Sequence, residues 1–346
     1  MSAVFTHARF ALVMLGFFTA CGKDPEPACS ALTGESVRGT GCDGLDCRQA
    51  MRDLVQEISV SARSLQPEFQ IVPQNGHELI TLDGEAAGPP AETYLAALDG
   101  VGREDLFYGY DSDDVASPED VQLGIVGFLD VALASGVQPL VTDYVRSASE
   151  HIADSQMRNA AQGYVSFAAP HRDLDLVPNE PMYSEYYPYQ SHAGDVTTLS
   201  SAKNFLYLLD PSGFSAKAQY LSALGDTDYD VLVIDSVFDE ADPLTETEVA
   251  SLKTKASGGR RLVIAYMSIG EAENYRAYWQ ADWQVGSPAF IAEENPEWCG
   301  NFKVKYWDPS WKSVIYGSGD SYLQAIVAAD FDGVYLDIID AFEYFE

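Results

Sequence analysis

The sequence of 346 residues predicts an α/β fold, and within that class a (β/α)8 TIM barrel. Short, continuous apolar runs alternate with stretches of helical apolar spacing, which is typical of a parallel sheet covered on both faces. Eight of the runs are strong strand candidates, and eight parallel strands close a barrel. With 47% hydrophobic residues, the chain has ample material for such a core.

The elements follow in order along the chain. A helix is expected over 49–66, where Met51, Leu54 and Ile58 share one face, and further helices over 118–136 and 245–259. A weaker ninth apolar run, 163–170, is expected as a closing or peripheral strand. The eight main strands are expected at 69–75, 98–104, 138–145, 204–210, 230–236, 261–270, 302–308 and 333–339.

The N-terminus predicts export. An apolar run over 10–18 follows His7 and Arg9 and is too short to span a bilayer. Small residues then lead into Cys21, which predicts a bacterial lipoprotein signal peptide over 1–21 with Cys21 lipidated; an ordinary signal peptide is the alternative. Either way the protein is expected in the cell envelope, lipid-anchored or secreted, with no membrane contact beyond that anchor.

Residues 22–48 are polar and rich in Gly, Pro and Cys, and predict a tether. Four further cysteines can pair in three ways, and a local bridge between the close pair Cys42 and Cys47 is plausible. Their irregular spacing does not favour a metal site. These cysteines are Cys29, Cys42, Cys47 and Cys299.

The formal net charge is −33, from 20 basic and 53 acidic residues. Such a surface repels nucleic-acid phosphates, so a nucleic-acid partner is not expected. It attracts cationic ligands, although solubility or adaptation to salt is the simpler explanation of the charge taken alone.

Acidic or amide side chains follow most of the expected strands. In a parallel barrel these strand ends share one face, where active sites are built. Carboxyl groups beside aromatic rings predict a carbohydrate site in which one acid is protonated and another ionised. A single Asp after a strand is more often a helix N-cap or an ion-pair partner, so the prediction rests on the pattern as a whole. The acids and amide are Asn75, Glu78, Glu104, Asp143, Asp235, Glu271, Glu273, Asp308, Asp337 and Asp340; the rings are Tyr266, Tyr275, Tyr306, Trp307, Trp311 and Tyr335.

Four long stretches of the sequence are distinctive: IVPQNGHELI (71–80), YMSIGEAENYRAYW (266–279), NPEWCGNFKVKYWDPSW (295–311) and FDGVYLDIIDAFEYFE (331–346). They resemble glycoside hydrolase family 114, the endo-α-1,4-polygalactosaminidase family. The resemblance extends over nearly all of 49–346 and implies a barrel that hydrolyses α-1,4-linked galactosamine polymers with two carboxylates and no cofactor. Such a polymer is cationic when deacetylated, so an acidic cleft would concentrate it.

The order of these stretches differs from that of the family. Residues 49–176 resemble its C-terminal part and residues 203–346 its N-terminal part. The sequence therefore predicts a single, circularly permuted barrel over 49–346, in which the aperiodic linker 177–202 joins the usual chain ends. Domain swapping and a fragment of a tandem are alternatives. Permutation makes two predictions about the strand at 333–339: the helix at 49–66 packs against it, and the strand at 69–75 is hydrogen-bonded to it.

The resemblance implies roles for individual residues. Asp337 is expected as nucleophile or base and Glu78 as general acid. His77 stands where the family often has an acid, and Arg276 is expected either to orient a carboxylate or to form a salt bridge. No metal or cofactor is expected, and the protein is expected to be a monomer. Substrate contacts are expected from Asp308 and Glu271 as ammonium or hydroxyl binders, then Glu273, Asp340, Glu104, Asp143 and Asn75, with Tyr266, Trp307 and Tyr335 as the sugar platform.

Two other functions fit the same residues. A surface lipoprotein can hold an amino-sugar polymer without cleaving it, and a related hydrolase can act on another α-linked polysaccharide.

Overall fold

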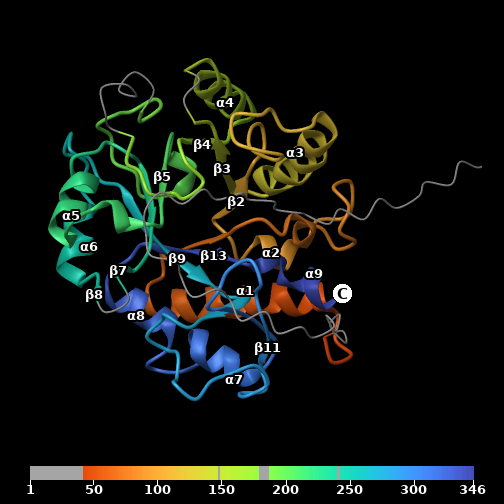
Figure 1. Ribbon diagram of the computed structural model, residues 1–346. Coiled ribbons are helices and arrows are strands. Elements are labelled where there is room, and N and C mark those ends of the chain that lie inside the picture. The colour runs from red at the N-terminus through yellow and green to blue at the C-terminus, as the bar shows by residue number, and fades with distance from the viewer. Residues whose placement is uncertain (1–41, 147–148, 179–186, 240–241) are drawn as a thin grey trace, which may run out of the picture. The chain divides into compact units, whose positions relative to one another are not determined.

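The computed structural model describes residues 42–146, 149–178, 187–239 and 242–346, which belong to one compact unit (Figure 1). The expected signal peptide, the lipidation site Cys21, Cys29 and residues 22–41 of the expected tether lie outside the described residues.

Two parallel sheets form the centre of this unit. One has five strands in the order β1-β13-β9-β6-β5, and the other has three in the order β2-β3-β4. Isolated parallel bridges join the edges of the two sheets: Gln74 pairs with Gly102, and Ser166 with Asn204. Gln74 directly follows β1 and Asn204 lies two residues before β5, so the two sheets are linked next to their edge strands. The strands are β1 (Gln70–Pro73), β2 (Gly100–Glu104), β3 (Gln138–Tyr144), β4 (Val165–Ala169), β5 (Leu206–Leu208), β6 (Val231–Ile234), β9 (Leu262–Ser268) and β13 (Gly333–Asp337).

The pairing of β1 with β13 joins segments from opposite ends of the chain. The register runs from Gln70 opposite Gly333 to Pro73 opposite Leu336. A side chain at Gly333 would place its Cβ 2.5 Å from the carbonyl oxygen of Gln70, so only glycine allows this approach. The expected pairing of these two strands is confirmed.

The helix α1 (Cys47–Leu65) fills the expected position at the start of the unit. Its apolar face is fully buried, and the helix contacts α8 (Tyr322–Ala328) and α9 (Phe342–Phe345). Figure 1 shows α1, in red and orange, between these two blue helices. The N-terminal helix thus covers the C-terminal segment that follows β13.

One strand assignment from the sequence is wrong. The run at 302–308 was expected in the parallel sheet, but β12 (Asn301–Val304) pairs antiparallel with β10 (Glu271–Glu273) and β11 (Ile291–Glu294). Its sequence, Phe302-Lys303-Val304-Lys305, alternates apolar and charged residues, as half-exposed antiparallel strands do. The weak candidate at 163–170 occupies the parallel position instead, because every residue of β4 is buried.

The remaining elements lie around these sheets. The helix expected at 245–259 ends at Leu252, because a glycine turn with Gly258 at φ 94° reverses the chain between Thr254 and Arg260. None of the helices in the described ranges has the length and apolarity needed to cross a membrane. The other elements are α2 (Glu92–Leu95), α3 (Glu119–Ala134), α4 (Ser149–Gln162), α5 (Lys217–Gly225), α6 (Glu246–Leu252), α7 (Pro309–Lys312), the hairpin β7 (Val237–Asp239) and β8 (Asp242–Pro243), and the short helices η1 (His77–Ile80), η2 (Leu199–Ser201), η3 (Pro211–Gly213), η4 (Ser313–Gly317) and η5 (Ile339–Ala341).

The expected linker 177–202 contacts a buried cation, Lys255, through residues 192 and 194. Lys255 Nζ donates to the carbonyl oxygens of His192 (3.1 Å) and Gly194 (2.9 Å) and forms an ion pair of 2.5 Å with Asp230. Both charged side chains are fully buried. This segment is therefore an ordered part of the unit.

Candidate active site

Asp337 is the last residue of β13, and its carboxyl group has two hydrogen-bond donors. Tyr266 OH donates to Oδ2 and the Ile338 amide to Oδ1, each at 2.8 Å. Burial, followed by the negative charge of Glu104, raises the pKa of Asp337 to about 7, although the Tyr266 hydrogen bond opposes the shift. Asp337 therefore retains its proton close to neutral pH, as a general acid must.

The backbone turns sharply directly after Asp337. Ile338 has φ 59°, a left-handed conformation that is costly for a β-branched residue. Gly270 makes room for this turn, since a Cβ there would lie 2.0 Å from the carbonyl oxygen of Ile338. This left-handed residue lies next to the candidate acid and turns the backbone away from the direction of β13.

Glu104 ends β2, and donors from two neighbouring strand ends orient its carboxylate. Tyr144 OH donates to Oε1, while Gln74 Nε2 and Asn75 Nδ2 (3.3 Å) donate to Oε2. Tyr207 OH in turn donates to Gln74 Oε1 at 2.9 Å, which fixes the amide's orientation. Glu104 is thus a held carboxylate, and its charge raises the pKa of Asp337.

Asp340 and Glu78 extend this acidic face. Asp340 lies in η5, where burial and then the charges of Glu78, Glu271 and Glu104 raise its pKa to about 6. Glu78 lies half-buried in η1. Glu104 and Asp340 contribute to the raised pKa of Asp337, whereas Glu78 contributes to that of Asp340. Of the two glutamates, Glu104 is the one whose charge is a main cause of the raised pKa of Asp337.

A small cavity of about 210 Å³ lies next to these acids. Glu271 is buried in its wall, where Asn295 Nδ2 donates to Oε1 (2.8 Å) and Asn301 Nδ2 to Oε2 (3.4 Å). Burial raises the pKa of Glu271. The cavity is thus lined by the carboxyl groups of Glu271 and Asp340, the amide of Asn295 and the ammonium group of Lys303. Its lining is Glu271, Asn295, Lys303, Ile338, Asp340, Ala341, Tyr344 and Phe345.

Glu273 is occupied by protein contacts. Arg276 forms ion pairs of 2.7 Å with both Glu273 and Asp235, and Tyr275 OH donates to Glu273 Oε1 at 2.6 Å. Arg276 and Glu273 are both buried. Arg276 thus orients two carboxylates inside the protein.

Asp143 is also enclosed. It is fully buried and accepts hydrogen bonds from the amides of Phe107 (2.7 Å) and Tyr108 (3.2 Å). Ser155 (2.6 Å) and Asn159 (3.1 Å) donate to its other oxygen. The expected substrate contact by Asp143 is therefore corrected: this carboxylate holds the loop after β2 against α4.

Tyr335 does not offer a face to a sugar. Its side chain is fully buried, its ring lies 5.1 Å from that of Tyr207, and it fills the space left by Gly102. Because β13 points this residue into the core, the expectation of a sugar platform at Tyr335 is corrected. Tyr266, by contrast, keeps a small exposed fraction and touches Asp337.

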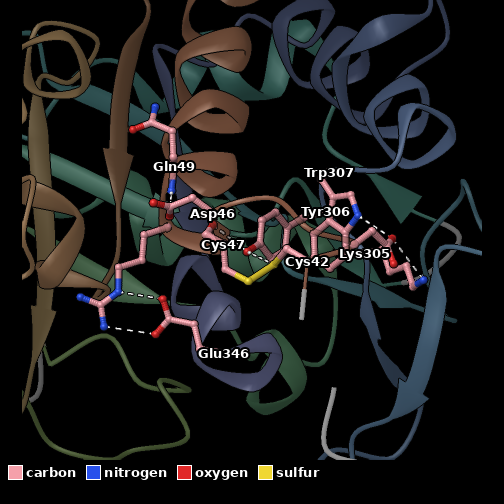
Figure 2. The surroundings of a disulfide bond; sticks show 10 residues. Cys42, Asp46, Cys47, Gln49, Lys305, Tyr306, Trp307 and Glu346 are labelled. Carbon is pink, nitrogen blue, oxygen red and sulfur yellow. Dashed lines mark hydrogen bonds and ion pairs between the residues drawn. A yellow bond between two sulfur atoms is a disulfide. The ribbon is translucent and has the colours of Figure 1, made fainter. Parts of the chain in front are cut away.

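Asp308 and Trp307 lie near the described start of the chain. Asp308 caps α7 by accepting a hydrogen bond from the Ser310 amide at 2.7 Å. Trp307 Nε1 donates to Asp43 Oδ2 at 3.0 Å, beside the disulfide (Figure 2). These contacts account for both side chains without a ligand.

The plausible local bridge is present, since Cys42 and Cys47 are disulfide-bonded, and Cys299 is disulfide-bonded as well. His77 is buried, and burial followed by the charge of Arg103 lowers its pKa well below the ordinary value. His77 is thus a neutral side chain of the interior.

Sequence reasoning missed three groups that hold Glu104 in place: Gln74, Tyr144 and, behind Gln74, Tyr207. Gln74 and Tyr144 lie at strand ends, directly beside the chosen residues Asn75 and Asp143. Their position at strand ends, next to residues already expected at the site, is the signal that could have found them. Across the described ranges, no group of three or more His, Cys, Asp or Glu side chains is arranged to hold a metal ion.

Comparison with known proteins agrees with the resemblance seen in the sequence. The model of Glycoside-hydrolase family GH114 matches residues 190–345. An uncharacterized protein of Methanocaldococcus jannaschii is 36% identical over 172 residues, which are 50% of this chain and 47% of that protein. An uncharacterized protein of Deinococcus radiodurans is 41% identical over 123 residues, or 36% of this chain and 37% of the relative.

A third uncharacterized protein, from Thermotoga maritima, is 46% identical over 81 residues, or 23% of this chain and 24% of the relative. The chain thus spans about half or less of the length of these curated relatives. Through residues 190–345, the chain is similar to glycoside hydrolase family 114.

Proposed function

We propose that this protein is an endo-acting glycoside hydrolase that cleaves an α-1,4-linked, galactosamine-containing polysaccharide with Asp337 and Glu104. The observation that carries the proposal is the coupling of these two carboxyl groups. Burial and the charge of Glu104 raise the pKa of Asp337 to about 7, and three donors orient Glu104. One acid that keeps its proton beside one oriented carboxylate is what glycoside hydrolysis requires.

In this mechanism Asp337 protonates the leaving glycosidic oxygen, and Glu104 acts as nucleophile or as base toward water. This assignment reverses the expected role of Asp337 and replaces Glu78 by Glu104. Tyr266 holds the Asp337 carboxyl group at 2.8 Å and so limits its rotation. Glu78 keeps a role in the acidic surroundings of Asp340.

The proposed architecture is a circularly permuted (β/α)8 barrel. The two bridges between the parallel sheets support closure, and the pairing of β1 with β13 supports permutation. In a barrel of parallel strands, Asp337 after β13 and Glu104 after β2 lie at the same face. The proposed site is thus formed by two strand ends that lie far apart in the sequence.

The proposed substrate is a cationic amino-sugar polymer. Glu271 and Asp340 face a cavity of about 210 Å³, which suits a small polar substituent rather than a whole chain. An ammonium group there would relieve the mutual repulsion of carboxylates that burial already disfavours. The net charge of −33 would also attract a polycation. We further propose an exported monomer, anchored through a lipid on Cys21.

The test is product analysis with a partly deacetylated α-1,4-galactosamine polymer and protein lacking residues 1–21. Release of oligomers by the wild type, and their loss in Asp337→Asn and Glu104→Gln with the fold intact, is the expected result. Binding of the polymer without release of oligomers would replace the enzyme by a binding protein. Cleavage of a different α-linked polysaccharide from a small panel would keep the mechanism and change the substrate.

A further inference from the structure

The turn between Cys42 and Cys47 is closed by a disulfide across five positions of sequence. A loop this short removes less entropy from the unfolded chain than a long loop does, so it contributes less to global stability. The bond instead defines the local geometry of the turn that leads into α1, whose N-cap is Asp46. With this geometry the turn contacts the aromatic residues Tyr306 and Trp307 (Figure 2).

The turn grips the segment that follows β12. Tyr306 OH donates to the carbonyl oxygen of Cys47 at 2.8 Å and lies 3.5 Å from Cys42 Sγ. On the other side of the turn, Asp43 accepts the hydrogen bond of Trp307 Nε1. Two adjacent aromatic residues are therefore oriented by a six-residue stretch whose ends are covalently joined.

These two aromatic residues hold the C-terminal segment. The ring of Phe345 lies 4.7 Å from that of Trp307 and 5.9 Å from that of Tyr306. Arg48, the second residue of α1, forms an ion pair of 2.9 Å with Glu346, and its guanidinium lies 5.2 Å from the Phe342 ring. The start of α1 thus secures the end of the chain from two sides.

The secured segment is one wall of the cavity. Asp340, Ala341, Tyr344 and Phe345 line it from the C-terminal side, and Glu271 lies in the opposing β10. Asp337 and Glu104, by contrast, end strands β13 and β2 and do not depend on this segment for their position.

We propose that the disulfide-closed turn Cys42–Cys47, with Arg48, is a positioning element for this cavity. It sets the distance between Asp340 and Glu271, and so the strength with which the cavity binds substrate. The proposal rests on the proposed function only in naming the cavity as a substrate site. Because the candidate catalytic pair is carried by strands, loosening the turn weakens binding and leaves the chemical step nearly unchanged.

The experiment compares the double variant Cys42→Ala/Cys47→Ala and Arg48→Met with a matched control, Arg63→Met. Arg63 is also on α1, and its side chain is 29% exposed, against 31% for Arg48. Arg63→Met removes an ion pair of 2.7 Å with Asp99, and Arg48→Met removes one of 2.9 Å with Glu346. Hydrogen exchange is followed in peptides covering 340–346, in β13 and in α3. Hydrolysis of the galactosamine polymer is resolved into kcat and KM.

In both test variants we expect exchange in 340–346 to rise about tenfold, with β13 and α3 unchanged. We also expect KM to rise about fivefold while kcat stays within about twofold, and Arg63→Met to match the wild type. Unchanged exchange in 340–346, or a uniform rise in all peptides, overturns the proposal. So does a fall in kcat at constant KM.

The failure of the proposed function is a separate outcome. If the wild type releases no oligomers, the exchange data together with the affinity for galactosamine oligosaccharides decide the positioning role. Faster exchange with weaker oligosaccharide binding supports it without hydrolysis, and faster exchange with unchanged binding overturns it.

Discussion

The hydroxyl group of Tyr266, on β9, donates a hydrogen bond of 2.8 Å to Asp337, at the end of the adjacent strand β13. This contact stabilises the ionised carboxylate, whereas burial and Glu104 stabilise the protonated form. The pKa of about 7 is the balance of these opposing effects. Changing any of them should move the pH dependence of the reaction in a known direction.

Removing the Tyr266 hydroxyl tests this balance. In Tyr266→Phe the ionised carboxylate loses a donor, so the pKa of Asp337 rises further. Since a general acid is active while protonated, the alkaline limb of the kcat/KM profile should shift to higher pH. The pH profile from 5 to 9 is the measurement. Tyr275→Phe, which touches Glu273 instead, is the control and should leave the limb in place.

Two glutamates distinguish the candidate pairs. Glu104→Gln should lower kcat by about 10² to 10⁴-fold, because it removes the carboxylate coupled to Asp337. Glu78→Gln should lower kcat by less than about tenfold, because its charge is a main cause of the raised pKa of Asp340 and not one of the main causes for Asp337. Steady-state kinetics on the same polymer decide between them. A larger loss in Glu78→Gln would restore the pair expected from the sequence.

The raised pKa of Asp337 also predicts a pH-dependent change in stability. Between the unfolded value of about 4 and the folded value of about 7, the folded state holds a proton that the unfolded chain has released. The free energy of unfolding therefore falls as pH rises through this window. Asp337→Asn removes the titration, so its stability relative to wild type should improve by about 1–2 kcal/mol from pH 4 to pH 8, a figure reduced for partial exposure.

Urea unfolding of both proteins at several pH values measures that difference. Any constant offset between them reflects the altered hydrogen bonds of the amide. A difference that does not change with pH would show that Asp337 titrates normally in the folded protein.

The ion pair between Lys255 and Asp230 makes a prediction about the linker. Lys255→Met leaves Asp230 buried without its cation and frees the carbonyl groups of His192 and Gly194. We expect a loss of about 3–5 kcal/mol in the free energy of unfolding, measured by urea titration. Lys217→Met, whose partners Asp242 and Glu248 are more exposed, should cost about 1 kcal/mol or less. Equal losses would contradict a special role for the buried pair.

Much of the parallel sheet could be predicted from local sequence. Apolar runs such as those of β6 and β9 are buried along their whole length and cannot be satisfied outside a covered sheet. The same reasoning failed where the signal was weaker. The run at 163–170, which is fully buried, lies in the parallel sheet. The run at 302–308 was expected there, but it is half-exposed and forms an antiparallel strand instead.

The candidate site was predicted less completely. The sequence predicts Asp337, Glu104, Glu271 and Asp340 as site residues from their positions near strand ends. The catalytic roles expected for Asp337 and Glu78 stay predictions, since residue type does not reveal which carboxyl groups interact. Asp143 shows the limit, because the donors of its four hydrogen bonds come from two other segments of the chain.

The sequence by itself determined the α/β class, the family resemblance and the set of acids near strand ends. These follow from local patterns: apolar periodicity, turn residues and motifs read along a continuous chain. Only the tertiary structure decided that Glu104 acts on Asp337 and that Tyr335 and Asp143 are enclosed. Burial and electrostatic coupling depend on distances between residues far apart in sequence, and those distances exist only once the chain has folded.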